Sequence, residues 1–116
     1  GLGGMFFLEE LERGSNGMMT GFSYPEILVA IYKAYSSGNQ KEAARIFYGA
    51  CPLLRYEFQP GIGLALRKEV YRQRGAITSA FVRHPGTQID EHLKKEIAGA
   101  LGYCDLGNLI EKEVAA

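Results

Sequence analysis

The sequence predicts a mainly α-helical chain that contains one short strand. Apolar residues recur every three or four positions through most of the 116 residues, and glycine, proline and capping side chains stand where these stripes begin and end. Fifteen residues are glycine, about twice the usual ~7%. With 47% hydrophobic and 22% charged residues, the length alone predicts one ordinary globular domain.

The first predicted helix spans Met5 to about Glu12, where apolar and acidic residues share the segment, and Gly14 stands where a left-handed residue ends a helix. The stretch Gly17–Phe22 is short, mostly apolar and bounded by turn residues, which favours a buried strand. Because a lone strand leaves backbone groups unpaired on both edges, we expect another segment to pair with it.

A second helix is predicted to start at a capping box formed by Ser23 and Glu26, with Pro25 in the first turn, where its missing N–H costs nothing. Its apolar face ends at Gly38.

A third helix restarts almost at once, because Asn39 is followed by Glu42 and then by a long apolar stripe. Pro52 lies within this stripe and is predicted to kink or interrupt the helix.

After a turn at Gln59-Pro60-Gly61, apolar residues at every fourth position predict a helix that ends at Gly75. The stretch 76–82 is less periodic and is predicted to be extended, up to a break at Arg83-His84-Pro85-Gly86.

Thr87 and Asp90 then resemble a capping box, and the clean apolar stripe that follows predicts a helix ending at Gly102. Asp105 is predicted to cap a last short helix that reaches the C-terminus.

Charge and hydropathy exclude several classes of partner. Thirteen Lys and Arg balance thirteen Asp and Glu, so a nucleic-acid partner is not expected. The longest apolar run, Ile27–Tyr32, is too short to span a bilayer, and no signal-peptide pattern opens the chain, so we expect a soluble protein without membrane contact. Cys51 and Cys104 are interpreted as reduced thiols of a cytoplasmic protein.

Two features leave a functional and a structural interpretation open. Gly1-Leu2-Gly3-Gly4 before a helix could bind an anion through bare backbone amides, or could be a plain tight turn. Thr20 lies at the end of the predicted strand, where α/β folds place functional side chains, but threonine also simply favours strands.

The remaining polar residues favour structural roles. The basic residues of the middle of the chain are interpreted as solvated helix faces paired with Glu57 and Glu69. Cys51 is interpreted as a buried, inert thiol. No metal site is expected, because neither histidine has a second ligand at metal spacing. Tyr56 and Tyr103 are expected to be core or interface aromatics. The basic residues of the middle of the chain are Arg55, Arg67, Lys68, Arg72, Arg74 and Arg83, and the two histidines are His84 and His92.

The residues alone form no catalytic constellation, because the lysines lie on charged helix faces rather than in an apolar stretch that would lower a lysine pKa.

An ordered set of landmarks nevertheless resembles a known family. Gly1–Glu26, which reads GLGGMFFLEELERGSNGMMTGFSYPE, is similar to the C-terminal part of the dihydrodipicolinate synthase and N-acetylneuraminate lyase family of Schiff-base aldolases. Three later stretches, GNQKEAA from Gly38, LALRKE from Leu64 and RHPG from Arg83, agree with that resemblance.

The resemblance implies the C-terminal fragment of a (β/α)8 TIM barrel with its helical extension. Residues 1–38 would then supply the mouth of the seventh strand, the seventh helix, the eighth strand and the eighth helix, and residues 39–116 would form the extension. The opening at Gly1 without a methionine is interpreted as a cut edge.

The resemblance also implies a substrate pocket for pyruvate or a related 2-oxo acid, with Gly1, Gly3, Met19 and Thr20 as pocket residues. Gly3 and Gly4 stand where the family's sialic-acid lyases carry acidic residues, which favours a smaller substrate. The family's Schiff-base lysine would lie upstream, since Lys41, Lys68, Lys94, Lys95 and Lys112 do not match its context. This chain therefore carries no predicted catalytic residue, metal site or cofactor, and we expect it to be inactive alone.

Two further interpretations stay open. The chain could be a helical self-association module, because helices made to cover a barrel would expose apolar surface without it; this predicts a homo-oligomer, with exchange of elements between copies as one route. A separate N-terminal chain that carries the lysine could also complete the barrel.

Overall fold

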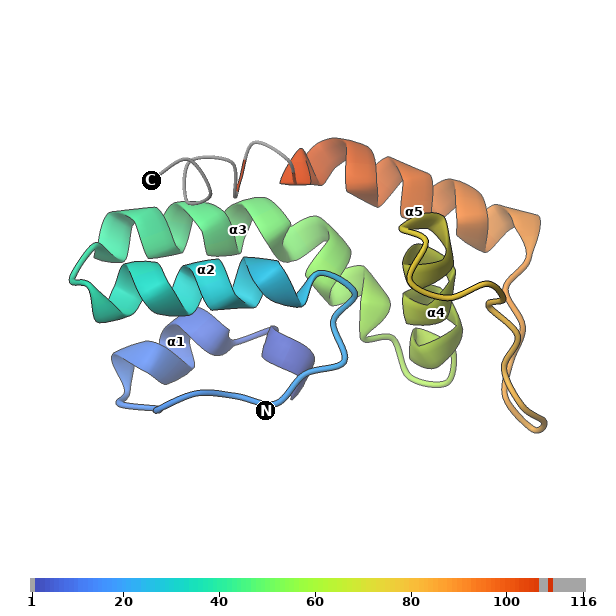
Figure 1. Cartoon of the computed structure of the whole chain (residues 1–116), viewed down its shortest axis with the longest axis horizontal. Helices are drawn as coiled ribbons and strands as arrows, with labels where there is room; N and C mark the ends of the chain where they lie inside the picture. The colour runs from blue at the N-terminus through green and yellow to red at the C-terminus, as the bar shows by residue number, and fades with distance from the viewer. Residues whose placement is uncertain (1, 107–108, 110–116) are drawn as a thin grey trace.

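The computed structural model, which describes residues 2–106 and 109, consists of helices joined by turns and irregular connections. A 3-10 turn, η1 (Leu2–Gly4), precedes the first helix, α1 (Phe7–Glu12). Four longer helices follow: α2 (Pro25–Ser36), α3 (Gln40–Glu57), α4 (Gly63–Gln73) and α5 (Glu91–Cys104). Figure 1 shows α1, α2 and α3 stacked on one another, with α5 continuing along the edge of α3 and α4 standing across both.

The hairpin of α2 and α3 is the centre of the molecule. Gly38 has a φ of 88°, and the N–H of Asn39 reaches back to the carbonyl of Ala34 at 2.9 Å, which ends α2 as a left-handed cap does. The side chain of Asn39 then accepts from the N–H of Glu42 at 3.2 Å and opens α3. Both predicted ends are confirmed, and they reverse the chain within a few residues.

The long helix α3 touches every other helix and carries most of the core. Its residues Ile46, Ala50 and Leu53 are fully buried among side chains of α1, α2 and α5. Pro52 lies inside the helix, which runs on through it, and the second half of α3 turns down toward α4 in Figure 1. A smaller core of Tyr56, Leu66, Val70 and Ile97 joins α3, α4 and α5 at that end.

The predicted strand Gly17–Phe22 is wrong for the described residues, which contain no strand. Residues 15–22 run instead as an extended connection from α1 to α2. A strand needs a neighbouring strand to bond with its backbone N–H and C=O groups. No described segment lies beside residues 17–22 as such a partner, so the stretch does not form a strand.

Two predicted capping boxes are also wrong. The first residue before α2 is Tyr24, and no side chain caps that helix, because both donors of Ser23 face a carboxylate on α3 instead. At α5 the cap is Asp90 itself, which accepts from the N–H of Leu93 at 2.9 Å, while Thr87 is exposed.

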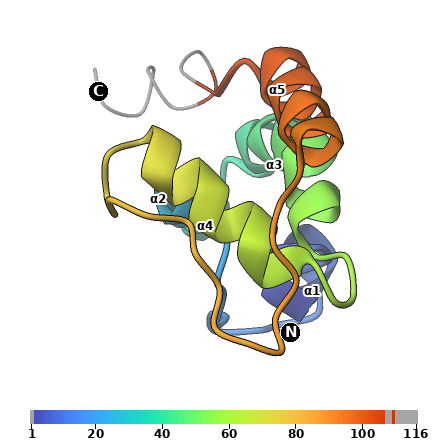
Figure 2. The same ribbon diagram turned by 90° about the vertical axis from the view of Figure 1, so that its right-hand side faces the viewer.

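The segment 75–90 forms an arm that loops out beside α4 (Figure 2). Gly75 ends α4 with a φ of 80°, as predicted. The side-chain amide of Gln88 donates to the carbonyl of Val82 at 2.6 Å and accepts from its N–H at 3.2 Å, so a side chain pairs with the extended stretch in place of a strand. The predicted break contains a tight turn, in which Gly86 N–H meets the Arg83 carbonyl at 2.7 Å, and a cis bond before Pro85.

The end of α5 falls later than predicted. The helix passes through Gly102 and stops at Cys104, where Asp105 takes the left-handed conformation with a φ of 47°. A short polar side chain can adopt that conformation, which is why Asp105 replaces the expected glycine. The last short helix predicted beyond Asp105 falls mostly on 107–108 and 110–116, outside the described residues.

Candidate functional site

The predicted pocket residues lie at the start of the chain and in the connection before α2. Gly3 has a φ of 67°, and a Cβ built on it would lie 2.0 Å from the ring of Phe58 at the end of α3. Only glycine fits this turn, because any side chain would meet both the ring and an unfavourable backbone conformation. The turn is therefore pressed against the end of α3.

Thr20 is bonded to this turn. Its hydroxyl donates to the carbonyl of Gly3 at 2.7 Å and accepts from the N–H of Phe22 at 2.9 Å. The structure thus brings together two of the predicted pocket residues, which are 17 positions apart in the sequence. Met19 is 89% exposed, and Gly1 is outside the described residues.

The N-terminal turn is closed by a hydrogen bond of its own. The N–H of Met5 is bonded within the turn to the carbonyl of Leu2 at 3.2 Å, and α1 starts only at Phe7, after Phe6, which makes no side-chain cap. The described part of Gly1–Gly4 is therefore a tight turn, which was the structural interpretation of this motif.

An apolar groove of about 350 Å³ opens beside Thr20, between α1, the connection and α2. Its lining is mostly hydrophobic, with Asn16, Thr20 and Tyr32 as the residues with polar side-chain groups, which is the usual make-up of a small-ligand pocket wall. The lining residues are Phe7, Asn16, Gly17, Met18, Thr20, Pro25, Leu28, Val29 and Tyr32.

The chain just after Thr20 is held by a carboxylate that the sequence analysis did not place in a site. Glu57 is fully buried, and its two oxygens accept from the N–H of Ser23 at 3.0 Å and from the Ser23 hydroxyl. Its pairing with a basic residue was expected, yet Arg67 donates to the backbone carbonyl of Glu57, at 3.2 Å, rather than to its carboxylate. The sequence did contain a signal for this role, because a charged residue within an apolar stripe has to be satisfied inside the core.

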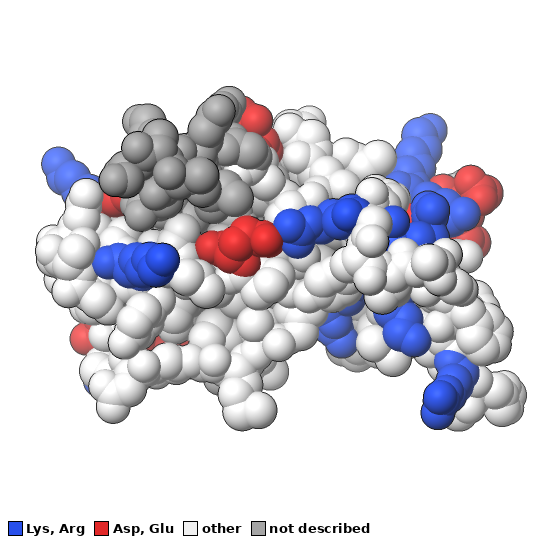
Figure 3. All heavy atoms as spheres, viewed as in Figure 1, with Lys and Arg blue, Asp and Glu red and all other residues white. Residues whose placement is uncertain are grey.

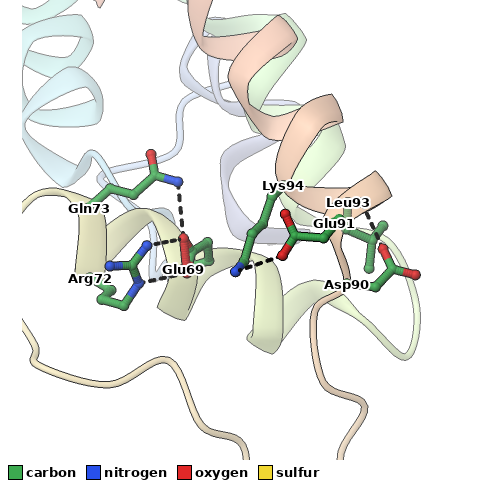
Figure 4. A network of polar contacts seen from close by, with 7 residues as sticks. All are labelled: Glu69, Arg72, Gln73, Asp90, Glu91, Leu93 and Lys94. Atoms are coloured by element: carbon green, nitrogen blue, oxygen red, sulfur yellow. Dashed lines mark hydrogen bonds and ion pairs between the residues drawn. The ribbon is translucent and has the colours of Figure 1, made fainter.

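Burial raises the pKa of Glu57 to about 7, against the opposing effects of its Ser23 hydrogen bonds and of the Arg67 charge. The other buried carboxylate, Glu69, behaves in the opposite way. Arg72 donates to both of its oxygens, at 2.7 and 2.8 Å, and Gln73 adds a third bond, so the pKa of Glu69 is lowered (Figure 4). The predicted pairing of Glu69 with the basic residues is confirmed.

Tyr71 of α4 and Arg74, the residue that follows α4, hold the same connection. The hydroxyl of Tyr71 donates to the carbonyl of Phe22 at 2.9 Å. Arg74 donates to the carbonyl of Ser23 at 2.5 Å, forms an ion pair with Glu26 at 2.8 Å, and lies 3.9 Å from the centre of the Tyr24 ring. The predicted box residue Glu26 is thus an ion-pair partner of Arg74.

The other basic residues do not gather into one field. On the face drawn in Figure 3, lysines and arginines are separated by uncharged atoms and by acidic residues, although more of them lie over the half that contains α4 and α5. Arg55 and Arg83 are exposed, and Lys68 donates to the carbonyl of Phe81 at 3.0 Å.

The thiols, histidines and tyrosines divide between core and surface. Cys104 is buried and Cys51 is half-buried, and burial raises the pKa of both thiols. The hydroxyl of Tyr56 donates to Glu96 at 2.5 Å, whereas Tyr103 is 87% exposed and so is no core residue of this chain. Both histidines, His84 and His92, are exposed.

The described residues contain neither a cluster of metal ligands nor a helix suited to cross a membrane. Among residues 2–106 and 109, no three His, Cys, Asp or Glu side chains come together as metal ligands. Within the same ranges, no helix has both the length and the apolar character needed to cross a membrane.

Comparison with known proteins places this arrangement among solved folds. The chain is similar to the crystal structure of a dihydrodipicolinate synthase from Rhodopseudomonas palustris, with a TM-score of 0.85 and 37% sequence identity over 88% of this chain and 34% of that one. It is also 28% identical, over 90 residues, to an L-2-keto-3-deoxyarabonate dehydratase from Azospirillum brasilense, which is 78% of this chain and 29% of the dehydratase. No family model matches the chain.

The chain therefore spans about a third of the length of the relatives it matches. The predicted resemblance is confirmed, and so is the fold class, since a mainly helical chain matches part of a much longer synthase.

Proposed function

Because the chain belongs to the dihydrodipicolinate synthase and N-acetylneuraminate lyase family, we propose that it forms the C-terminal part of a lyase that acts on pyruvate or a related 2-oxo acid. In this proposal residues 1–38 complete a TIM barrel and residues 39–116 form its helical extension. The carbonyl of the substrate condenses with a lysine amine, releasing water and leaving an imine, and that lysine belongs to another part of the barrel.

The similarity in both sequence and fold to a dihydrodipicolinate synthase is the observation that carries this proposal. The name of the Azospirillum relative, a dehydratase of a 2-keto acid, supports the substrate class. The absence of acidic side chains at Gly3 and Gly4 supports a small substrate over a sialic acid.

The proposed pocket wall consists of Gly3 and Thr20, together with Gly1 and Met19. The bond between the Thr20 hydroxyl and the Gly3 carbonyl fixes the two described loops that would face the barrel mouth. Since that hydroxyl already has both a donor and an acceptor partner, Thr20 shapes the wall rather than attacking the substrate.

The lysines support the proposal that these residues do not catalyse alone. A lysine that forms a Schiff base needs an apolar surrounding to release its proton near neutral pH. In the described ranges no lysine is buried: Lys33, Lys41 and Lys95 are exposed, and Lys68 and Lys94 are half-buried.

Borohydride trapping tests this proposal. Pyruvate and borohydride should leave the mass of the 116-residue chain unchanged, because no lysine imine forms to be reduced. A stable covalent adduct would contradict the proposed inactivity. The Rhodopseudomonas synthase in which this chain replaces the matching third should be trapped, and Thr20→Val should weaken pyruvate binding there, with exposed Thr87→Val as the matched control.

We also propose that the isolated chain self-associates, because it exposes large apolar side chains. Leu2 is 70% exposed, Met19 89% and Tyr103 87%, and a second groove, of about 510 Å³, lies between Met5, α3 and Tyr103. Such surface favours association between copies. Sedimentation equilibrium should find a homodimer or a larger assembly, and a well-folded monomer at micromolar concentration would contradict this.

A further inference from the structure

The connection from Thr20 to Tyr24 is irregular backbone, and yet its centre is as deeply buried as the core. Phe22 and Ser23 are both fully buried, although neither belongs to a helix. Buried irregular backbone must find hydrogen-bond partners outside its own segment. At the centre of the segment, both donors of Ser23 and the carbonyls of Phe22 and Ser23 find their partners on α3, on α4 and at Arg74, which follows α4.

The contacts form a continuous series that starts at the pocket wall. The Gly3 carbonyl accepts from Thr20, whose hydroxyl accepts from the N–H of Phe22. The next residue, Ser23, gives both of its donors to Glu57. Glu57 on α3 therefore binds Ser23, which lies three residues after Thr20, whose hydroxyl bonds to Gly3.

Glu57 differs from Glu69, the other buried carboxylate of the described residues, in where its hydrogen-bond partners lie. Glu69 bonds to Arg72 and Gln73 on its own helix, so its contacts are local. Those of Glu57 cross from α3 to residue 23, a separation of 34 positions. No buried side-chain nitrogen or oxygen in the described residues lacks a partner, and Glu57 satisfies two donors of Ser23 that an apolar side chain would leave unmet.

We propose that Glu57 is a positioning residue, which fixes Thr20 against Gly3 by holding both donors of Ser23. The proposal deepens the proposed function and rests on it, because it assigns to α3 the control of a pocket wall. Glu57 itself touches neither Thr20 nor Gly3 in any hydrogen bond and acts through the chain between them.

The same geometry makes the position of the wall depend on pH. Burial places the pKa of Glu57 at about 7, so the carboxylate gains or loses its proton near neutrality. When it is protonated, one oxygen becomes a donor, and the Ser23 hydroxyl must turn its own proton elsewhere. The ionisable groups that face Glu57 or its neighbours are Arg67 and Tyr71 of α4, Arg74 just after α4, Tyr24 and Glu26 near the start of α2, and Cys104 of α5.

Nuclear magnetic resonance on the 116-residue chain tests the proposal. The methyl resonance of Thr20 should shift with a midpoint near pH 7 in the wild type and stay constant in Glu57→Gln, whose amide keeps an acceptor and a donor for Ser23. A Thr20 resonance that is constant with pH in the wild type, or that still titrates in Glu57→Gln, would overturn the proposal.

Amide hydrogen exchange gives a second readout. In Glu57→Leu, the N–H of Ser23 should exchange at least about tenfold faster, as expected for the loss of a bond to a charged group. The N–H of Phe22, which bonds to Thr20, should also exchange faster because Thr20 loses its fixed position, and Glu57→Gln should restore protection. Glu69→Gln is the matched control: relative to the core amides of α3, exchange of both groups should be unchanged, because it removes a buried carboxylate with local contacts. Unchanged exchange in a folded Glu57→Leu would contradict the proposal.

These readouts separate this inference from the proposed function. Neither involves a 2-oxo acid, so a chimeric synthase that fails to trap pyruvate leaves the Thr20 titration to be judged by itself. If Glu57→Leu does not fold, the wild-type titration and its loss in Glu57→Gln still decide the question.

Discussion

Glu57→Gln should make the chain more stable at pH 8 and should lower its stability by about 1 kcal/mol near pH 4, where only the cost of an unpartnered amide proton remains. The reason is that ionised Glu57 is buried with two hydrogen bonds from Ser23 but without an ion pair to its carboxylate in the described structure. Glutamine has nearly the same shape and never ionises, so the variant avoids the desolvation that the carboxylate suffers above its pKa.

The sign follows from the two pKa values. In the folded chain the pKa of Glu57 is about 7, above its ordinary value of 4.5. Between these values the folded state keeps a proton that the unfolded state has released, so the free energy of unfolding falls as pH rises from 4.5 to 7 and then levels off. The difference corresponds to about 3 kcal/mol at about 1.4 kcal/mol per pH unit.

The expected gain of Glu57→Gln at pH 8 is therefore up to about 3 kcal/mol, less about 1 kcal/mol for the second amide proton, which has no partner in the core. Urea unfolding followed by far-UV circular dichroism at pH 4, 5, 6, 7 and 8 measures it. Subtracting the variant curve from the wild-type curve removes the contribution of every other titrating group. Equal slopes for both proteins between pH 5 and 7, or a wild-type curve that rises more steeply, would refute the reasoning.

Three further predictions concern single side chains. Gly3→Ala should lower the free energy of unfolding by at least about 1 to 2 kcal/mol, because the added Cβ meets the Phe58 ring at a φ of 67°; thermal unfolding measures it, and an unchanged midpoint contradicts it. Asn39→Ala should cost about 1 kcal/mol by removing the cap of α3, measured in urea. Glu69→Gln should destabilise by about 1 kcal/mol at pH 7 by weakening the bonds from Arg72, and that loss should disappear as pH falls below the lowered pKa of Glu69.

The helix ends could be predicted because their chemistry is local. Gly14, Gly38 and Gly75 each end a helix with a positive φ, and Asn39 caps the next one, as the sequence predicts. These signals need only a few neighbouring residues, so tertiary contacts did not override them.

Most of the wrong predictions fall where the outcome depends on which second group is available as a partner. Ser23 has the spacing of a capping box, but its hydroxyl faces Glu57, 34 residues later. The stretch Gly17–Phe22 has the composition of a strand, but a strand is a property of two segments, and no described segment pairs with it. At α5 the competition is closer, and Asp90 caps the helix in place of Thr87.

Only part of the candidate site could be predicted from the sequence, because the remaining contacts join residues that are far apart in the chain. Gly3 and Thr20 came from the resemblance, and the structure joins them by a hydrogen bond, whereas Met19 faces solvent. Glu57 was assigned to a solvated helix face, although it follows Leu53 and Leu54 in an apolar stripe. Periodicity tells that such a position is buried, but it cannot tell which distant donor satisfies the charge.

A carboxylate that costs stability when ionised still has a physical justification at this place. The connection before α2 has no regular structure, so the N–H and hydroxyl of Ser23 need an acceptor that lies inside the core. An apolar residue at position 57 would avoid the desolvation of a charge but would leave both donors unmet, and it would leave the path from Thr20 to Tyr24 without its central contact. The stability lost near neutral pH is thus consistent with a segment selected for one defined position beside the proposed pocket, which is where strain and cost are expected to concentrate.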